Sequence, residues 1–139
     1  MKRKGIYSKK IIKMKNHLKI EDYSTILEQY EGGNVALCDF SLSLHRIALE
    51  VVHEKREETL YILFVSCDFY SGPLVWRNSH LSLEHCLEDN SKITIIRDLK
   101  NGYFVKSGGV VMMLYDEEED NFKFDEIADI PPPIENRPG

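Results

Sequence analysis

The chain has 139 residues, of which 42% are hydrophobic and 29% are charged, and its formal net charge is −5. This length and composition predict one soluble domain over residues 1–139, and they exclude wholesale disorder and a disulfide scaffold. The apolar run Leu60 to Val65 is far shorter than the roughly 20 residues of a membrane-spanning helix, so no membrane partner is expected.

Charge is the most uneven feature of the sequence. Residues 1–20 contain eight Lys and Arg and no Asp or Glu, whereas residues 21–139 contain ten Lys and Arg against 23 Asp and Glu. The first segment therefore carries +8 and the remainder carries −13. We expect a strongly acidic body preceded by a basic N-terminal arm or helix.

The three cysteines, Cys38, Cys67 and Cys86, are odd in number and widely spaced. This pattern does not predict a disulfide framework, and it indicates a reducing compartment. The residues that follow Lys2-Arg3-Lys4 lack the apolar stretch of a secretion signal. We therefore expect a cytoplasmic protein.

Two segments near the N-terminus have helical periodicity. Within residues 1–20, one apolar stripe at spacings of four, three and four is formed by Tyr7, Ile11, Met14 and Leu18. A helix is also predicted for residues 21–33, because Asp22 is a suitable N-cap and Gly32-Gly33 is a natural stop. Its apolar residues are Tyr23, Ile26, Leu27 and Tyr30.

Residues 34–115 change to the alternation that is typical of strands. Apolar residues alternate with polar ones from Phe40 to Leu44, and again with the opposite parity from Ile47 to Val51. If both sets face one core, a bulge or a tight bend must fall near His45-Arg46. This region is predicted to be an antiparallel β core.

Further along, Leu60 to Val65 has no polar alternation, which predicts a central strand covered on both faces. Ser71-Gly72-Pro73 is expected to end that strand. Trp76 is large and rigid, so it could be a core residue or an exposed anchor, and its alternation with Leu74 favours the core. More strands are predicted around Leu81 to Leu83 and Ile93 to Ile95.

The clearest local signal is Asn101-Gly102, which favours the type I′ turn of a β-hairpin. Gly108-Gly109 predicts a second tight turn, so that residues 104–107 and 110–115 would complete a meander of three strands. An acidic, proline-rich segment follows over residues 116–139 and is not expected in the core. The predicted fold is α+β and mostly β, with one or two N-terminal helices packed on an antiparallel, meander-rich sheet of six to seven strands that curls or closes like a barrel.

No sequence motif indicates catalysis or a cofactor. Nucleophile elbows, metalloprotease helices, phosphate loops and dinucleotide-binding fingerprints are absent from the sequence. The best local metal-ligand set is His80, Glu84, His85 and Cys86, but the five-residue spacing of the histidines suits neither one helix face nor one strand face. Cys67-Asp68 lacks the electropositive partner of a reactive thiol. We predict no metal and no cofactor, and an unrecognised enzyme with groups from distant strands is kept as an alternative.

An acidic surface is the main functional candidate. Its potential would speed encounter with a basic protein, and aromatic side chains beside it would supply affinity. The expected contact residues are Asp116, Glu117, Glu118, Glu119, Asp120, Phe122, Tyr115, Glu54, Glu57 and Glu58. We predict a non-enzymatic protein-binding domain, an immunity-type inhibitor or adaptor, whose partner is a basic protein such as a toxin.

The string Ser71 to Asn78, followed by the Asn101-Gly102 hairpin, resembles small bacterial β-rich proteins. Some proteins of that style are encoded beside toxins as immunity partners, which is what the resemblance implies here. The resemblance covers residues 30–115 and transfers no functional residue.

The main alternative is a nucleic-acid-associated protein that binds phosphates through residues 1–20. The acidic remainder of the chain opposes this alternative, because it repels a phosphate backbone, and no aromatic–glycine RNA-binding motif accompanies the basic segment. Exposed edge strands would in addition allow a homodimer.

Overall fold

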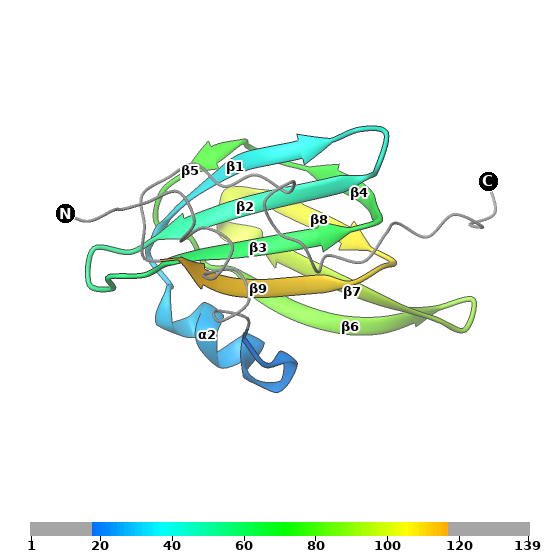
Figure 1. Ribbon diagram of the computed structural model, residues 1–139, viewed down its shortest axis with the longest axis horizontal. Helices are drawn as coiled ribbons and strands as arrows, with labels where there is room; N and C mark the ends of the chain where they lie inside the picture. The colour runs from blue at the N-terminus through cyan, green and yellow to red at the C-terminus, as the bar shows by residue number, and fades with distance from the viewer. Residues whose placement is uncertain (1–17, 117–139) are drawn as a thin grey trace, which may run out of the picture.

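The computed structural model describes residues 18–116, which form two antiparallel β-sheets packed face to face and one short helix beside them (Figure 1). Sheet A has the strand order β5-β1-β2-β3-β9, and sheet B has the order β4-β8-β7-β6. The strands of sheet A are β5 (Val75–Trp76), β1 (Asn34–Ser41), β2 (Arg46–Val52), β3 (Thr59–Val65) and β9 (Val111–Asp116). Those of sheet B are β4 (Cys67–Ser71), β8 (Tyr103–Ser107), β7 (Ser91–Asp98) and β6 (Ser82–Glu88). The predicted class, α+β and mostly β, is confirmed.

The side chains of β3 alternate between two buried clusters. Ile62 belongs to the main core between the sheets, to which both sheets and the helix contribute. Tyr61 and Leu63 lie on the opposite face of sheet A, where they pack with Ala48 and Leu114 and are almost inaccessible to solvent. β3 is therefore buried on both faces, as its unbroken apolar sequence predicts.

The helix α2 (Tyr23–Gln29) follows a 3₁₀ turn, η1 (Ile20–Asp22), and buries its apolar residues against the core. The Tyr23 hydroxyl accepts the backbone N–H of Met113 at 3.1 Å, which ties the helix to β9. The helix ends before Gly32, whose φ of 92° favours glycine. The predicted helix is correctly placed but shorter than the range given to it.

Parts of the predicted organisation lie outside the described residues. These parts are residues 1–17 of the basic arm and the acidic, proline-rich segment from residue 117 onward. Within residues 18–116, no helix is both long and apolar enough to cross a membrane.

The prediction of one sheet with six or seven strands is wrong, because the chain changes sheet four times between β3 and β9. Two of these crossings share a corner. The chain leaves β3 at Ser66, which has a left-handed φ of 65°, and it leaves β8 at Gly108-Gly109. The Val65 N–H donates to the Val110 carbonyl at 2.8 Å, and the Gly108 N–H donates to the Ser66 carbonyl at 3.3 Å. The result is two open sheets and not a closed barrel.

A buried hydroxyl holds this corner together. The fully buried Oγ of Ser107 lies 3.0 Å from the carbonyl oxygen of Val65 and 3.3 Å from that of Ser66, within hydrogen-bond distance of both. It also accepts the N–H of Gly109 at 3.4 Å. A Cβ at Gly109 would lie 2.2 Å from the Val65 carbonyl oxygen, so only glycine allows the two crossings to approach this closely.

Three local predictions are corrected by the strand order. β9 does not pair with β8 as the third strand of a meander. It pairs with β3, because the chain crosses to the other sheet at Gly108-Gly109. The β7–β8 hairpin is present, but its connection contains a 3₁₀ turn, η2 (Leu99–Asn101), and Gly102 alone has a positive φ there, so the turn is not type I′. Ser71 ends β4 and not β3. The tight bend expected at His45 is present, with a φ of 56°.

A fully buried carboxylate, Asp98, organises the opposite end of sheet B. It accepts hydrogen bonds from Trp76 Nε1 at 2.9 Å, from the His80 N–H at 2.8 Å, and from the Asn101 side-chain amide at 2.9 Å. Burial raises the pKa of Asp98, but the hydrogen bonds from His80, Asn101 and Trp76 outweigh burial and hold that pKa below 3.8. Trp76 is thereby fixed in the core, as predicted.

Replacement of the corner hydroxyl tests its role. We expect Ser107→Ala to lower the free energy of unfolding by about 1–3 kcal/mol, because buried polar groups at the crossing lose a partner. Urea denaturation at pH 7 measures this change. Ser91→Ala, at the exposed start of β7, is the matched control, and an equal effect of the two substitutions would contradict the proposed role of Ser107.

Asp98 gives a pH-dependent prediction. Because its pKa in the folded protein is lowered, the carboxylate stabilises the fold above its ordinary pKa, and this contribution is lost as the pH falls below about 4. Asp98→Asn should lower the free energy of unfolding at pH 7 by about 1–3 kcal/mol. The difference in the free energy of unfolding between Asp98→Asn and the unsubstituted protein should shrink as the pH falls from 4 to about pH 2 to 3, where we expect acid to unfold the protein. Urea denaturation across this pH range measures the difference, and Asp89→Asn at an exposed position is the control. A stability difference that does not change with pH would contradict the prediction.

Candidate functional site

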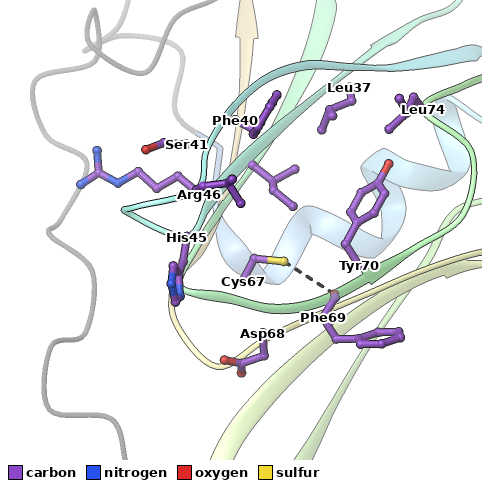
Figure 2. Close-up of a pocket in the computed structure, with 12 residues that line it drawn as sticks. Leu37, Phe40, Ser41, His45, Arg46, Cys67, Asp68, Phe69, Tyr70 and Leu74 are labelled. Atoms are coloured by element: carbon purple, nitrogen blue, oxygen red, sulfur yellow. Dashed lines mark hydrogen bonds between the residues drawn. The ribbon is translucent and has the colours of Figure 1, made fainter. Parts of the chain in front are cut away.

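An apolar cleft lies at the end of the sandwich where the β1–β2 turn faces the start of β4 (Figure 2). Its volume is about 500 Å³, within the range of cavities that bind ligands or side chains of a partner. The lining residues are Leu37, Phe40, Ser41, Leu42, His45, Arg46, Ile47, Cys67, Asp68, Phe69, Tyr70 and Leu74. The cleft therefore joins residues of both sheets.

The walls of the cleft are fixed by backbone hydrogen bonds. The carbonyl of His45, in its left-handed conformation, accepts the N–H of Cys67 at 2.8 Å, which binds the β1–β2 turn to β4. The Leu37 N–H donates to the Leu74 carbonyl at 2.8 Å, and the Tyr70 hydroxyl donates to the Pro73 carbonyl at 3.0 Å. The cleft is thus formed by the fold itself.

The interior of the cleft offers contact surface for apolar groups. Figure 2 shows Leu37 and Phe40 on one side and Cys67 and Tyr70 on the other, with the guanidinium of Arg46 directed away from the centre. The Cys67 thiol donates to the Phe69 carbonyl, with 3.6 Å between sulfur and oxygen. Burial raises the pKa of Tyr70, so its phenol stays neutral at ordinary pH. The arrangement is suited to burying an apolar group.

The apolar surface continues beyond the cleft. Phe40 is 59% exposed, Leu42 is 82% exposed and Leu74 is 58% exposed, although all three line the cleft. Leu44, in the same turn as Leu42, and Val75, on β5 next to Leu74, are also exposed. Exposed apolar side chains beside a cleft are typical of binding surfaces in soluble proteins.

The acidic residues predicted as contacts lie at the other end of the sandwich. Glu54, Glu57 and Glu58, here called the acidic turn, connect β2 to β3, whereas the cleft lies at the β1–β2 turn, at the opposite end of β2. Glu54 and Glu57 are exposed and Glu58 is half-buried. Asp116 pairs with Thr59 across β9 and β3, so the acidic run begins beside the acidic turn.

The remaining predicted contact residues are placed only in part. Tyr115 is half-buried, and its ring centroid lies 6.1 Å from that of Tyr30. Phe122 and residues 117–120 lie outside the described residues. Sequence reasoning missed the cleft itself, because the alternation from Phe40 to Leu44 was interpreted as a core face. The parity change at His45-Arg46 was the available signal, since it marks the turn at which these side chains leave the core.

The two histidines considered as metal ligands in the sequence have other partners. His80 Nδ1 lies 2.8 Å from a carboxylate oxygen of Glu31, and His85 Nδ1 lies 3.1 Å from the Thr94 hydroxyl. Over residues 18–116, no group of three or more His, Cys, Asp or Glu side chains is placed to hold a metal ion.

Comparisons of the chain with protein-family models, curated proteins and solved structures find no match.

Proposed function

We propose that this protein is a non-catalytic protein-binding domain whose cleft receives apolar side chains of a partner protein. The observation that carries the proposal is the preformed cleft of about 500 Å³, bordered by exposed Phe40, Leu42 and Leu74. Burying large apolar side chains of this kind supplies most of the affinity in protein interfaces.

A protein partner accounts for more of this surface than a small ligand does. A small molecule in the cleft would leave Leu44 exposed, because this residue does not line the cleft. A partner protein that covers the β1–β2 turn removes Leu44 from water together with Phe40 and Leu42. The extent of the exposed apolar surface therefore favours a macromolecule.

The proposal is tested by introducing charged side chains at the rim of the cleft. Phe40→Glu with Leu42→Glu should weaken partner binding at least tenfold, because an apolar contact is replaced by two buried charges. Both side chains are exposed, so the fold is expected to tolerate the change. The tagged full chain, carrying a photo-crosslinking residue at position 44, identifies the partner in cells, and titration with that purified partner measures the dissociation constant.

The matched control is Leu87→Glu with Leu99→Glu, two equally exposed apolar residues away from the cleft. The control should bind as the unsubstituted chain does. Equal binding by the cleft variant, or equal weakening by the control, contradicts the proposal. A copurified apolar small molecule in place of a crosslinked protein also contradicts it.

The acidic turn is a second candidate surface for the same class of function. The pairing of Thr59 with Asp116 favours it, because it brings the first residue of the acidic run next to the acidic turn although the two are far apart in sequence. Such a surface complements a basic partner, as an immunity-type inhibitor of a cytoplasmic toxin would require. Lys55 and Arg56 lie in the same turn and reduce its net charge, so the cleft carries the main proposal.

Neutralising the acidic turn tests whether this surface contributes to binding in addition to the cleft. If the turn contacts a basic partner, Glu54→Gln with Glu57→Gln and Glu58→Gln should slow association severalfold and flatten its dependence on salt. Stopped-flow or surface-binding kinetics with the crosslinked partner measure both effects. The control carries the same number of changes in the β6–β7 hairpin, namely Glu84→Gln, Glu88→Gln and Asp89→Asn. Unchanged association at low salt would rule out the acidic turn as a contact.

A further inference from the structure

A histidine side chain caps the turn between β2 and β3. The backbone N–H of Lys55 donates to Nδ1 of His53 at 3.0 Å, and Nε2 of the same ring lies 3.1 Å from the backbone carbonyl oxygen of Glu31. The N–H of Arg56 also donates to the His53 carbonyl at 2.9 Å. One imidazole therefore closes the turn and links it to the chain that follows α2.

These two contacts fix the protonation state of the ring. Nδ1 accepts the hydrogen bond from the Lys55 N–H, so this nitrogen carries no hydrogen of its own. The Glu31 carbonyl can only accept, so Nε2 carries the proton. The neutral tautomer with hydrogen on Nε2 satisfies both partners, whereas a doubly protonated ring places two N–H donors against each other at Nδ1.

The surroundings of the ring do not replace the lost acceptor. The Tyr30 ring lies edge-on to His53 with 6.5 Å between centroids, and the Arg56 guanidinium lies 5.2 Å above the same Tyr30 ring. The charged and titratable groups on the elements that adjoin the ring are Tyr30, Glu31, His80, Glu54, Lys55, Arg56, Glu57, Glu58 and Tyr115. The carboxylates attract a protonated ring and Arg56 repels it, but neither gives the Lys55 N–H an acceptor.

We propose that His53 is a pH-sensitive latch of the β2–β3 turn: protonation of the ring releases the Lys55 N–H and loosens the segment that carries the acidic turn. The inference rests on the two ring contacts alone and does not depend on the proposed function. Its consequence is that the shape of this acidic segment depends on whether the His53 ring carries one proton or two.

Two substitutions of His53 separate the effect of its hydrogen-bond acceptor from the effect of its charge. His53→Asn keeps an acceptor, because an asparagine side chain bonds the N–H two residues ahead in an Asx turn, and it removes the titration. His53→Ala removes the acceptor at every pH. The readout is the hydrogen-exchange protection factor of the Lys55 amide, measured by NMR on the full chain between pH 7.5 and 5 and corrected for intrinsic rates.

In the unsubstituted protein, we expect the protection factor of Lys55 to fall about fivefold to tenfold on acidification, as loss of one net hydrogen bond produces. It should stay high in His53→Asn and stay low in His53→Ala. His85→Asn, on β6, should behave as the unsubstituted protein does. A pH response that persists in His53→Asn, or ring nitrogen shifts that place the neutral proton on Nδ1, would overturn the proposal.

Discussion

The structure depends on one corner at which the chain passes from β3 to β4 and, later, from β8 to β9. The two crossings touch through backbone hydrogen bonds and through the Ser107 hydroxyl. The contact is possible because Gly109 has no side chain to meet the Val65 carbonyl. The same corner sends β9 back to sheet A beside β3 and starts β4 under the β1–β2 turn, so it determines both the core and the cleft.

Local patterns in the sequence were sufficient to predict most elements. The helix near Tyr23, the doubly buried strand β3 and the bend at His45 follow from periodicity, although the expected N-cap Asp22 makes no capping hydrogen bond through its side chain. The sheet to which each strand belongs did not follow. Gly108-Gly109 has the chemistry of a hairpin turn, and a hairpin and a crossing of sheets need the same local freedom. The pairing of β9 with β3 decides between the two, and that contact joins distant parts of the chain.

The candidate site was predictable to a smaller extent. Charge counts locate the acidic turn, but its position beside Asp116 depends on the strand register. The cleft was missed because Phe40 and Leu42 have the alternation of core residues, and alternation does not show whether another element covers them. Their exposure is a property of the packed sheets. His53 gave no signal, since a histidine in a polar turn is common and its role depends on contacts with Lys55 and Glu31.

The return of β9 to sheet A has a consequence for synthesis on the ribosome. β3 is the most apolar strand, and one of its edges is paired only by β9. Until Val111–Asp116 have been made, that edge remains open while sheet B can already assemble from β4, β6, β7 and β8. An open apolar edge is prone to pair with other nascent chains, and non-local pairing of this kind is slow. Pausing of translation before β9 would therefore favour aggregation, whereas pausing after it would not.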